Sequence, residues 1–169
     1  MTTKRVAKDK AEGRRLYRPE SEEEMKDLTI YKVSLVKDRT IEYIPSAKSS
    51  DDVYEIAKVM GLDTSAEEFM GVICLNTNGN MTSYHEVSHG DLSSSAAHPR
   101  EIFKRAILSN SAAIILVHNH PNGNVTPSLT DIETTKRMMQ AGEILGITVL
   151  DHIIVGDDTY HSMKSCNEM

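Results

Sequence analysis

The sequence has few cysteines and no long apolar run. Its two cysteines, Cys74 and Cys166, are too few for a disulfide framework or a cysteine-based zinc module. The longest unbroken aliphatic run, residues 112–117, is far shorter than the roughly 20 residues that span a bilayer. No positively charged segment followed by an apolar one opens the chain, so we expect no secretory leader and no membrane attachment. These absences favour a cytoplasmic protein.

Positive charge is concentrated at the start of the chain. The net charge of −6 is the sum of +5 over residues 1–19 and −11 over the rest. A body that acidic repels polyphosphate, so we expect nucleic acid to contact at most the basic stretch, which is more often simply a solvated terminus. With 169 residues, of which 39% are hydrophobic, the chain is long enough for one core. We therefore assign residues 1–27 to a basic, weakly ordered tail and residues 28–169 to one folded domain.

Apolar periodicity predicts alternating strands and helices in the body of the chain. Helices are expected from Ser49 to Gly61, from Pro99 onward and from Ser128 to Gly146, each with a typical start or stop residue. Strands are expected within 28–44 and at 69–75, 81–88, 112–117, 147–155 and 160–163. This alternation around one core is typical of an α/β domain with two or three layers.

One histidine pair matches the sequence pattern of a zinc protease but not the helical conformation that this pattern requires. His85, Glu86 and His89 read as H-E-x-x-H, which binds zinc when a helix brings its two histidines to within about 6 Å of each other. Here the segment follows the turn signal Asn78-Gly79, so a strand is predicted. In a strand the two histidines stand about 13 Å apart, at ~3.3 Å per residue. We therefore expect that they do not share a metal ion.

A second pair, His118 and His120, ends the predicted strand at residues 112–117. Separated by one residue, the two side chains point to the same side of an extended chain, about 6.6 Å apart at the backbone. Asp131, in the first turn of the next helix, could be a third ligand and leave one position open, as in a catalytic zinc site. On their own, Ser128 and Asp131 indicate only the capping pair of a helix.

The assembled pattern resembles a known signature. The JAMM motif of the MPN/JAB metalloproteases is similar to a pattern in this chain: His118-x-His120, then seven residues, Ser128, two residues and Asp131. That family has an upstream glutamate before an apolar strand, and Glu68 stands in this place, with the neighbouring Glu67 as the alternative.

The likeness is more specific to the bacterial RadC branch of this family and covers roughly residues 45–165. Three stretches carry it: His98-Pro99-Arg100-Glu101-Ile102-Phe103, His118-Asn119-His120-Pro121-Asn122-Gly123 and Leu150-Asp151-His152-Ile153-Ile154-Val155-Gly156. The chain departs from the branch at Asn122, where serine is usual, a small polar exchange in a loop. Where full-length members have a helix-hairpin-helix module, the sequence shows a basic tail and a predicted strand region, so we expect a short form of the family.

The resemblance implies an α/β fold of the MPN/JAB, cytidine deaminase-like type, with a curved mixed β-sheet flanked by helices. It implies a zinc-dependent metallopeptidase or isopeptidase that hydrolyses an amide bond in a protein or peptide substrate. Glu68 would act as general base and Ser128 would stabilise the oxyanion. The implied ligands of Zn2+ are His118, His120 and Asp131.

Two other functions stay open from the sequence. The chain could be a DNA-repair or recombination accessory protein that contacts nucleic acid through residues 1–19, or a binding module that keeps the fold without turnover. Asp151 and His152 are candidates for a hydrogen bond to a ligand histidine, although structural roles suit them equally well. Cys74 is expected in the core.

Overall fold

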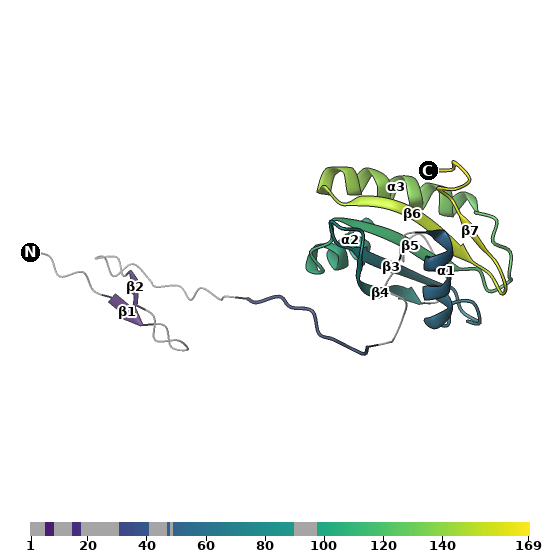
Figure 1. Cartoon of the computed structure of the whole chain (residues 1–169). Helices are drawn as coiled ribbons and strands as arrows, with labels where there is room; N and C mark the ends of the chain where they lie inside the picture. Colours follow the sequence, from purple (N-terminus) through teal and green to yellow (C-terminus); the bar gives the residue numbers. More distant parts are fainter. Residues whose placement is uncertain (1–5, 9–14, 18–30, 41–46, 48, 90–97) are drawn as a thin grey trace, which may run out of the picture. The chain divides into compact units, whose positions relative to one another are not determined.

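The computed structural model of the chain describes residues 6–8, 15–17, 31–40, 47, 49–89 and 98–169, and it separates into two units, Met1–Val33 and Ser34–Met169 (Figure 1). The first unit contains a short antiparallel pair of strands, β1 (Val6–Lys8) and β2 (Arg15–Tyr17). The sequence did not predict this pair, because the stretch has no alternating apolar residues. The predicted domain boundary after residue 27 lies outside the described residues and stays a prediction.

The second unit is built on a mixed sheet of five strands in the order β4-β3-β5-β6-β7. The neighbours β5 and β6 run parallel, and the other adjacent pairs run antiparallel. The strands are β3 (Phe69–Leu75), β4 (Met81–His89), β5 (Ala113–Asn119), β6 (Thr148–Val155) and β7 (Tyr160–Ser162). The central strand β5 is thus covered by a neighbour on each edge.

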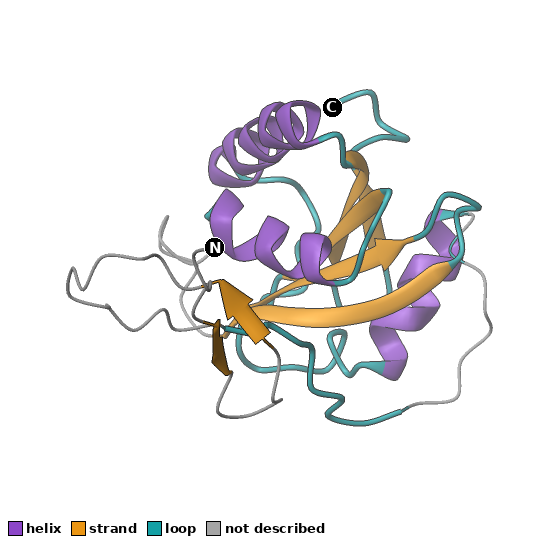
Figure 2. Ribbon diagram, turned by 90° about the vertical axis from the view of Figure 1, so that its left-hand side faces the viewer, coloured by secondary structure: helices purple, strands orange, loops and turns teal. Residues whose placement is uncertain are grey.

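Helices cover both faces of this sheet and make three layers (Figure 2). Helices α2 (Pro99–Leu108) and α3 (Leu129–Leu145) lie on one face, where Val72 of the sheet packs with Phe103 and Met138. Helix α1 (Ser50–Val59) lies on the other face, where Ile73 packs with Val53. Because β3 is buried on both faces, its apolar residues run without a polar interruption.

Local capping explains where two of the helices begin. Ser49 and Asp52 form a capping box before α1, and Ser128 and Asp131 form another before α3. Helix α3 ends at Gly146, whose φ of 68° lies in the left-handed region that glycine adopts without strain. The helix ends therefore follow from residues next to them in the sequence.

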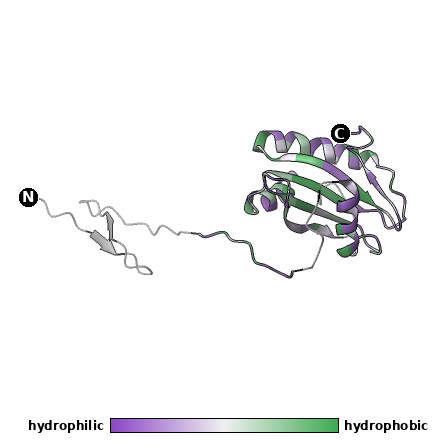
Figure 3. Ribbon diagram, viewed as in Figure 1, coloured by the Kyte–Doolittle hydropathy of each residue, from purple (hydrophilic) through white to green (hydrophobic). Residues whose placement is uncertain are grey.

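Hydropathy follows the same layering. In Figure 3 the apolar residues are concentrated on the central strands, whereas the helices alternate between apolar and polar residues. Cys74 is buried in the sheet as predicted, and Cys166 is exposed. None of the helices that the structure describes combines the length and the apolar character needed to cross a membrane.

The structure confirms an α/β fold with a mixed sheet between helices and decides in favour of three layers. The predicted elements from residue 49 onward are present, with ends within two residues of those expected. The prediction of strands within 28–44 is wrong for residues 31–40, which form no strand, and its remaining residues, 28–30 and 41–44, lie outside the described part of the chain. Tyr31 and Val36 there are 84% and 90% exposed, and none of the described strands pairs with residues 31–40 to take up their backbone hydrogen bonds.

Candidate metal centre

Three polar side chains gather where β5 ends and α3 begins. His118 lies in β5 opposite Met70 of β3 on one side and Ile154 of β6 on the other. It is 0% exposed, and Asp131, in the first turn of α3, is 5% exposed. His120 follows directly after β5 and is half-buried.

The donor atoms of these three residues face one another. His118 Nε2 lies 3.0 Å from His120 Nε2 and 3.2 Å from Asp131 Oδ1, and His120 Nε2 lies 3.4 Å from Asp131 Oδ2. The sequence-predicted ligand set is therefore brought together. Two neutral imidazoles and one carboxylate at this spacing could hold a divalent metal ion.

Asp131 is held in this orientation by the residue that caps its helix. The backbone N–H and the hydroxyl of Ser128 both donate to Asp131 Oδ2, at 2.7 and 2.6 Å. Burial acts to raise the pKa of the Asp131 carboxyl, but the rings of His118 and His120 would donate to it when protonated on Nε2, and this outweighs burial and holds that pKa well below its usual range. Asp131 is thus an anion, and the hydroxyl proton of Ser128 is directed at it, not at the open side of the cluster.

Glu68 reaches the same cluster from the start of β3. One of its carboxylate oxygens and one ring nitrogen of each of His118 and His120 lie within 4.8 Å of one another. The alternative, Glu67, pairs with His89 at 3.1 Å and keeps 60% of its side chain exposed. The structure therefore places Glu68, and not Glu67, beside His118 and His120.

Asn119 positions the segment that carries Glu68. The sequence did not predict this role. Its side-chain oxygen accepts from the backbone N–H of Phe69 at 2.8 Å, and its side-chain nitrogen donates to the carbonyl of Glu67 at 3.0 Å. Asn119 is 1% exposed, so these bonds are shielded from water. The peptide groups on both sides of Glu68 are thereby tied to the residue that separates the two histidines.

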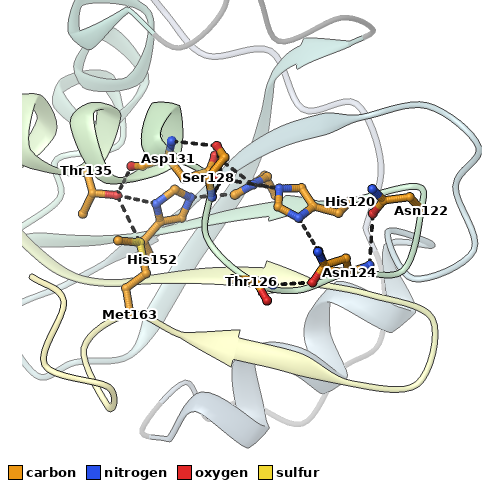
Figure 4. A network of polar contacts seen from close by, with 10 residues as sticks. His120, Asn122, Asn124, Thr126, Ser128, Asp131, Thr135, His152 and Met163 are labelled. Carbon is orange, nitrogen blue, oxygen red and sulfur yellow. Dashed lines mark hydrogen bonds and ion pairs between the residues drawn. The ribbon is translucent and has the colours of Figure 1, made fainter.

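The loop after β5 orients His120. The Nδ1 of His120 hydrogen-bonds the carbonyl oxygen of Asn124, and only a protonated nitrogen can donate to that acceptor (Figure 4). The Nε2 that faces His118 is then the unprotonated nitrogen of the neutral ring. The side chain of Asn122 accepts from the backbone N–H of Asn124 at 3.0 Å, so the residue that departs from the RadC pattern contributes a bond to this loop.

Asp151 and His152 are neighbours in the sequence but have different roles. His152 Nε2 lies 2.8 Å from His118 Nδ1, so His152 contacts a candidate ligand. Burial keeps the pKa of His152 well below its ordinary value, which favours the neutral ring. Asp151 instead accepts from the hydroxyl of Ser162 at 2.6 Å and from the backbone N–H of Lys164 at 3.1 Å, which ties β6 to the segment around β7.

The H-E-x-x-H pattern lies on β4, as the sequence predicted. His85 Nε2 lies 2.8 Å from the hydroxyl oxygen of Ser109, whereas His89 pairs with Glu67. The two histidines therefore have different partners. Among the described residues, the group that could hold a metal ion includes neither of them.

Comparison with known proteins gives one consistent result. The family model described as "RadC-like JAB domain" matches residues 47–168, which include every residue of the cluster. A UPF0758 protein of Syntrophomonas wolfei is 42% identical over 121 residues, 70% of this chain and 52% of that protein. A UPF0758 protein of Desulforamulus reducens is 52% identical over 103 residues, 61% of this chain and 45% of that protein. The chain spans about half the length of the curated relatives it matches.

Metal binding at this cluster should depend on pH through His120. The hydrogen bond that the protonated His120 ring donates to the Asp131 carboxylate raises the pKa of His120 above its ordinary 6.5. A proton must leave Nε2 before a metal ion can bind there, so the apparent affinity for Zn2+ should fall about tenfold per pH unit below that raised pKa and level off above it. Calorimetric titration with Zn2+ between pH 6 and 8 measures this. An affinity that does not change over that range would contradict the prediction, and His85→Ala should give the wild-type profile.

Proposed function

The chain belongs to the family of RadC-like JAB domains, and on this premise we propose that it is a zinc-dependent hydrolase of peptide or isopeptide bonds. The observation that carries the proposal is the convergence of His118, His120 and Asp131, with donor atoms 3.0 to 3.4 Å apart. Ligand atoms that each lie about 2.0–2.1 Å from a tetrahedral zinc ion are separated by about 3.3 Å. The donor set therefore fits zinc in both chemistry and spacing.

Two carboxylates compete for the role of third ligand, and the contacts favour Asp131. Its two oxygens each face one histidine, and Ser128 holds one of those oxygens with two hydrogen bonds. A carboxylate oxygen of Glu68 also lies within 4.8 Å of one ring nitrogen of each histidine. That leaves Glu68 beside the open position, where a general base is required.

The proposed reaction uses Glu68 for proton transfer. When bound, a zinc ion polarises a carbonyl group and lowers the pKa of water to about 7. Glu68 accepts the proton of the water that attacks the carbonyl carbon and then gives it to the leaving amine nitrogen. Ser128 is the candidate donor to the carbonyl oxygen as it gains negative charge, which requires its hydroxyl to turn away from Asp131.

The metal content of three proteins tests the ligand assignment. Wild-type protein should contain one equivalent of zinc, and His118→Ala should lose it because two donors cannot retain the ion. The matched control, His85→Ala, should keep it, since His85 contacts Ser109 and not the cluster. Elemental analysis after dialysis measures all three. Zinc retained by His118→Ala and lost by His85→Ala would reverse the assignment.

Substitution of Glu68 separates a base from a ligand. Glu68→Gln should keep the zinc content and lower turnover at least about a hundredfold, since a positioned base contributes about 10²–10⁴ in rate. The probe is a peptide library derived from a bacterial proteome, with new amino termini counted by mass spectrometry. Glu67→Gln, one residue away and paired with His89, is the control and should cleave as wild type does. Loss of zinc from Glu68→Gln would make Glu68 a ligand instead.

A second candidate function, contact with nucleic acid, is favoured by one feature of the first unit. The register of β1 and β2 places Lys8 opposite Arg15, so both strands bring cationic residues to the same two-stranded ribbon. Residues 1–19 carry a charge of +5, and cationic segments bind polyphosphate with strong dependence on salt.

Deletion of residues 1–19 tests this second function. The full chain should be retained on immobilised duplex DNA at low salt and released as salt is raised, because counterions compete for the phosphates. The deleted chain should pass through at every salt concentration while keeping its zinc. Equal retention of both proteins would exclude the basic stretch as the contact.

A further inference from the structure

Behind the metal centre, a chain of hydrogen bonds connects two of the candidate ligands through the core. Thr135 Oγ1 donates to the backbone carbonyl of Asp131 at 2.7 Å and lies 2.6 Å from His152 Nδ1 (Figure 4). His152 Nε2 in turn lies 2.8 Å from His118 Nδ1. Thr135, His152 and His118 are each 0% exposed, and they come from α3, β6 and β5. No water from solvent can therefore replace a missing partner.

The direction of this chain follows from the number of protons available. Thr135 has one hydroxyl proton, and a carbonyl oxygen such as that of Asp131 can only accept. When Thr135 gives its proton to this carbonyl, its oxygen must accept from His152 Nδ1–H. The neutral His152 then has a bare Nε2, which accepts from His118 Nδ1–H. The remaining nitrogen of His118, Nε2, is left unprotonated and faces His120 and Asp131.

The opposite direction would block the site. If the hydroxyl of Thr135 donated to His152 Nδ1, then His152 Nε2–H would donate to His118 Nδ1. A neutral His118 would then carry its proton on Nε2, the atom aimed at the other candidate ligands, and could not bind a metal ion there. The carbonyl of Asp131 thus selects between two tautomers of a histidine on another element.

We propose that Thr135 and His152 are positioning residues that hold His118 in the tautomer with a free Nε2, as the buried bonds from the Asp131 carbonyl to the His118 ring indicate. This inference rests on the proposed function of the same site. It assigns a role to a threonine that takes no part in the ligand motif. A second residue of the chain, His152, acts only through His118.

Packing alone does not account for this arrangement. A threonine inside a helix satisfies its hydroxyl by bonding to the carbonyl four residues earlier, so Thr135 needs no histidine partner. His152 is followed in β6 by Ile153, Ile154 and Val155, where an aliphatic residue would be buried without desolvating two ring nitrogens. Its two nitrogens are instead both engaged, one by Thr135 and one by His118.

The test compares three substitutions on the same helix. Thr135→Val keeps the shape and removes the hydroxyl, whereas Thr135→Ser keeps the hydroxyl and loses a methyl group. Thr134→Val is the matched control, since it makes the same change one position away. Zn2+ affinity is measured by competition with a chromophoric chelator. Thr135→Val should weaken binding by about 10- to 100-fold, as loss of a partner behind a ligand histidine does, and the other two variants should stay within about twofold of wild type.

A second measurement reads the tautomer directly and needs no metal. Nitrogen-15 NMR of the wild type should show His152 neutral with its proton on Nδ1, and Thr135→Val should shift the proton toward Nε2. A wild-type His152 protonated on Nε2 would overturn the inference, whether or not the protein binds zinc. Equal weakening by Thr135→Val and Thr135→Ser would also overturn it, because packing would then explain the loss.

The two proposals fail in different ways. A wild type that binds no Zn2+ while His152 keeps its proton on Nδ1 would refute the zinc site and leave the hydrogen-bond chain standing. If Thr135→Val binds Zn2+ as tightly as the wild type does, the positioning role is refuted and the zinc site stands.

Discussion

The register of β5 between its two neighbours is the constraint on which the site depends. Antiparallel pairing with β3 sets His118 opposite Met70, and parallel pairing with β6 sets it opposite Ile154. A slip of one residue would send His118 to the α1 face of the sheet, since side chains alternate between faces. It would then lose both Asp131, which α3 presents on the other face, and the ring of His152 in the next strand. Strand pairing therefore decides whether the candidate metal centre can form.

The start of α3 serves the helix and the site with the same atoms. Asp131 Oδ2 accepts the capping bond from the backbone of Ser128, and Oδ1 faces His118. The helix dipole also favours a negative charge in this first turn. The candidate ligand is thereby oriented before any ion arrives, and a change at Ser128 would affect both helix capping and ligand geometry.

Different buried polar residues hold different parts of the site in place. Asn119 fixes the peptide groups beside Glu68, and His152 and Thr135 fix the ring of His118. Burying such groups is costly unless they are paired, and each of these four hydrogen bonds joins atoms no more than 3.0 Å apart. The family match over residues 47–168 spans this whole arrangement, so the cluster lies within the part of the chain shared with its relatives.

The sequence by itself determined the elements and the half of the site that is local. Spacing within residues 118–131 placed His118, His120 and Asp131 together, because one strand end, one loop and one helix start connect them. It could not choose between Glu67 and Glu68, and it missed Asn119 and Thr135. The contact of Thr135 with His152 joins positions 17 apart in the chain, and that of Asn119 with Glu67 joins positions 52 apart. Periodicity records only the conformation of neighbouring residues, whereas these contacts depend on which strands pair and how the helices pack across the whole sheet. Only the tertiary structure therefore determines which of these distant residues come into contact.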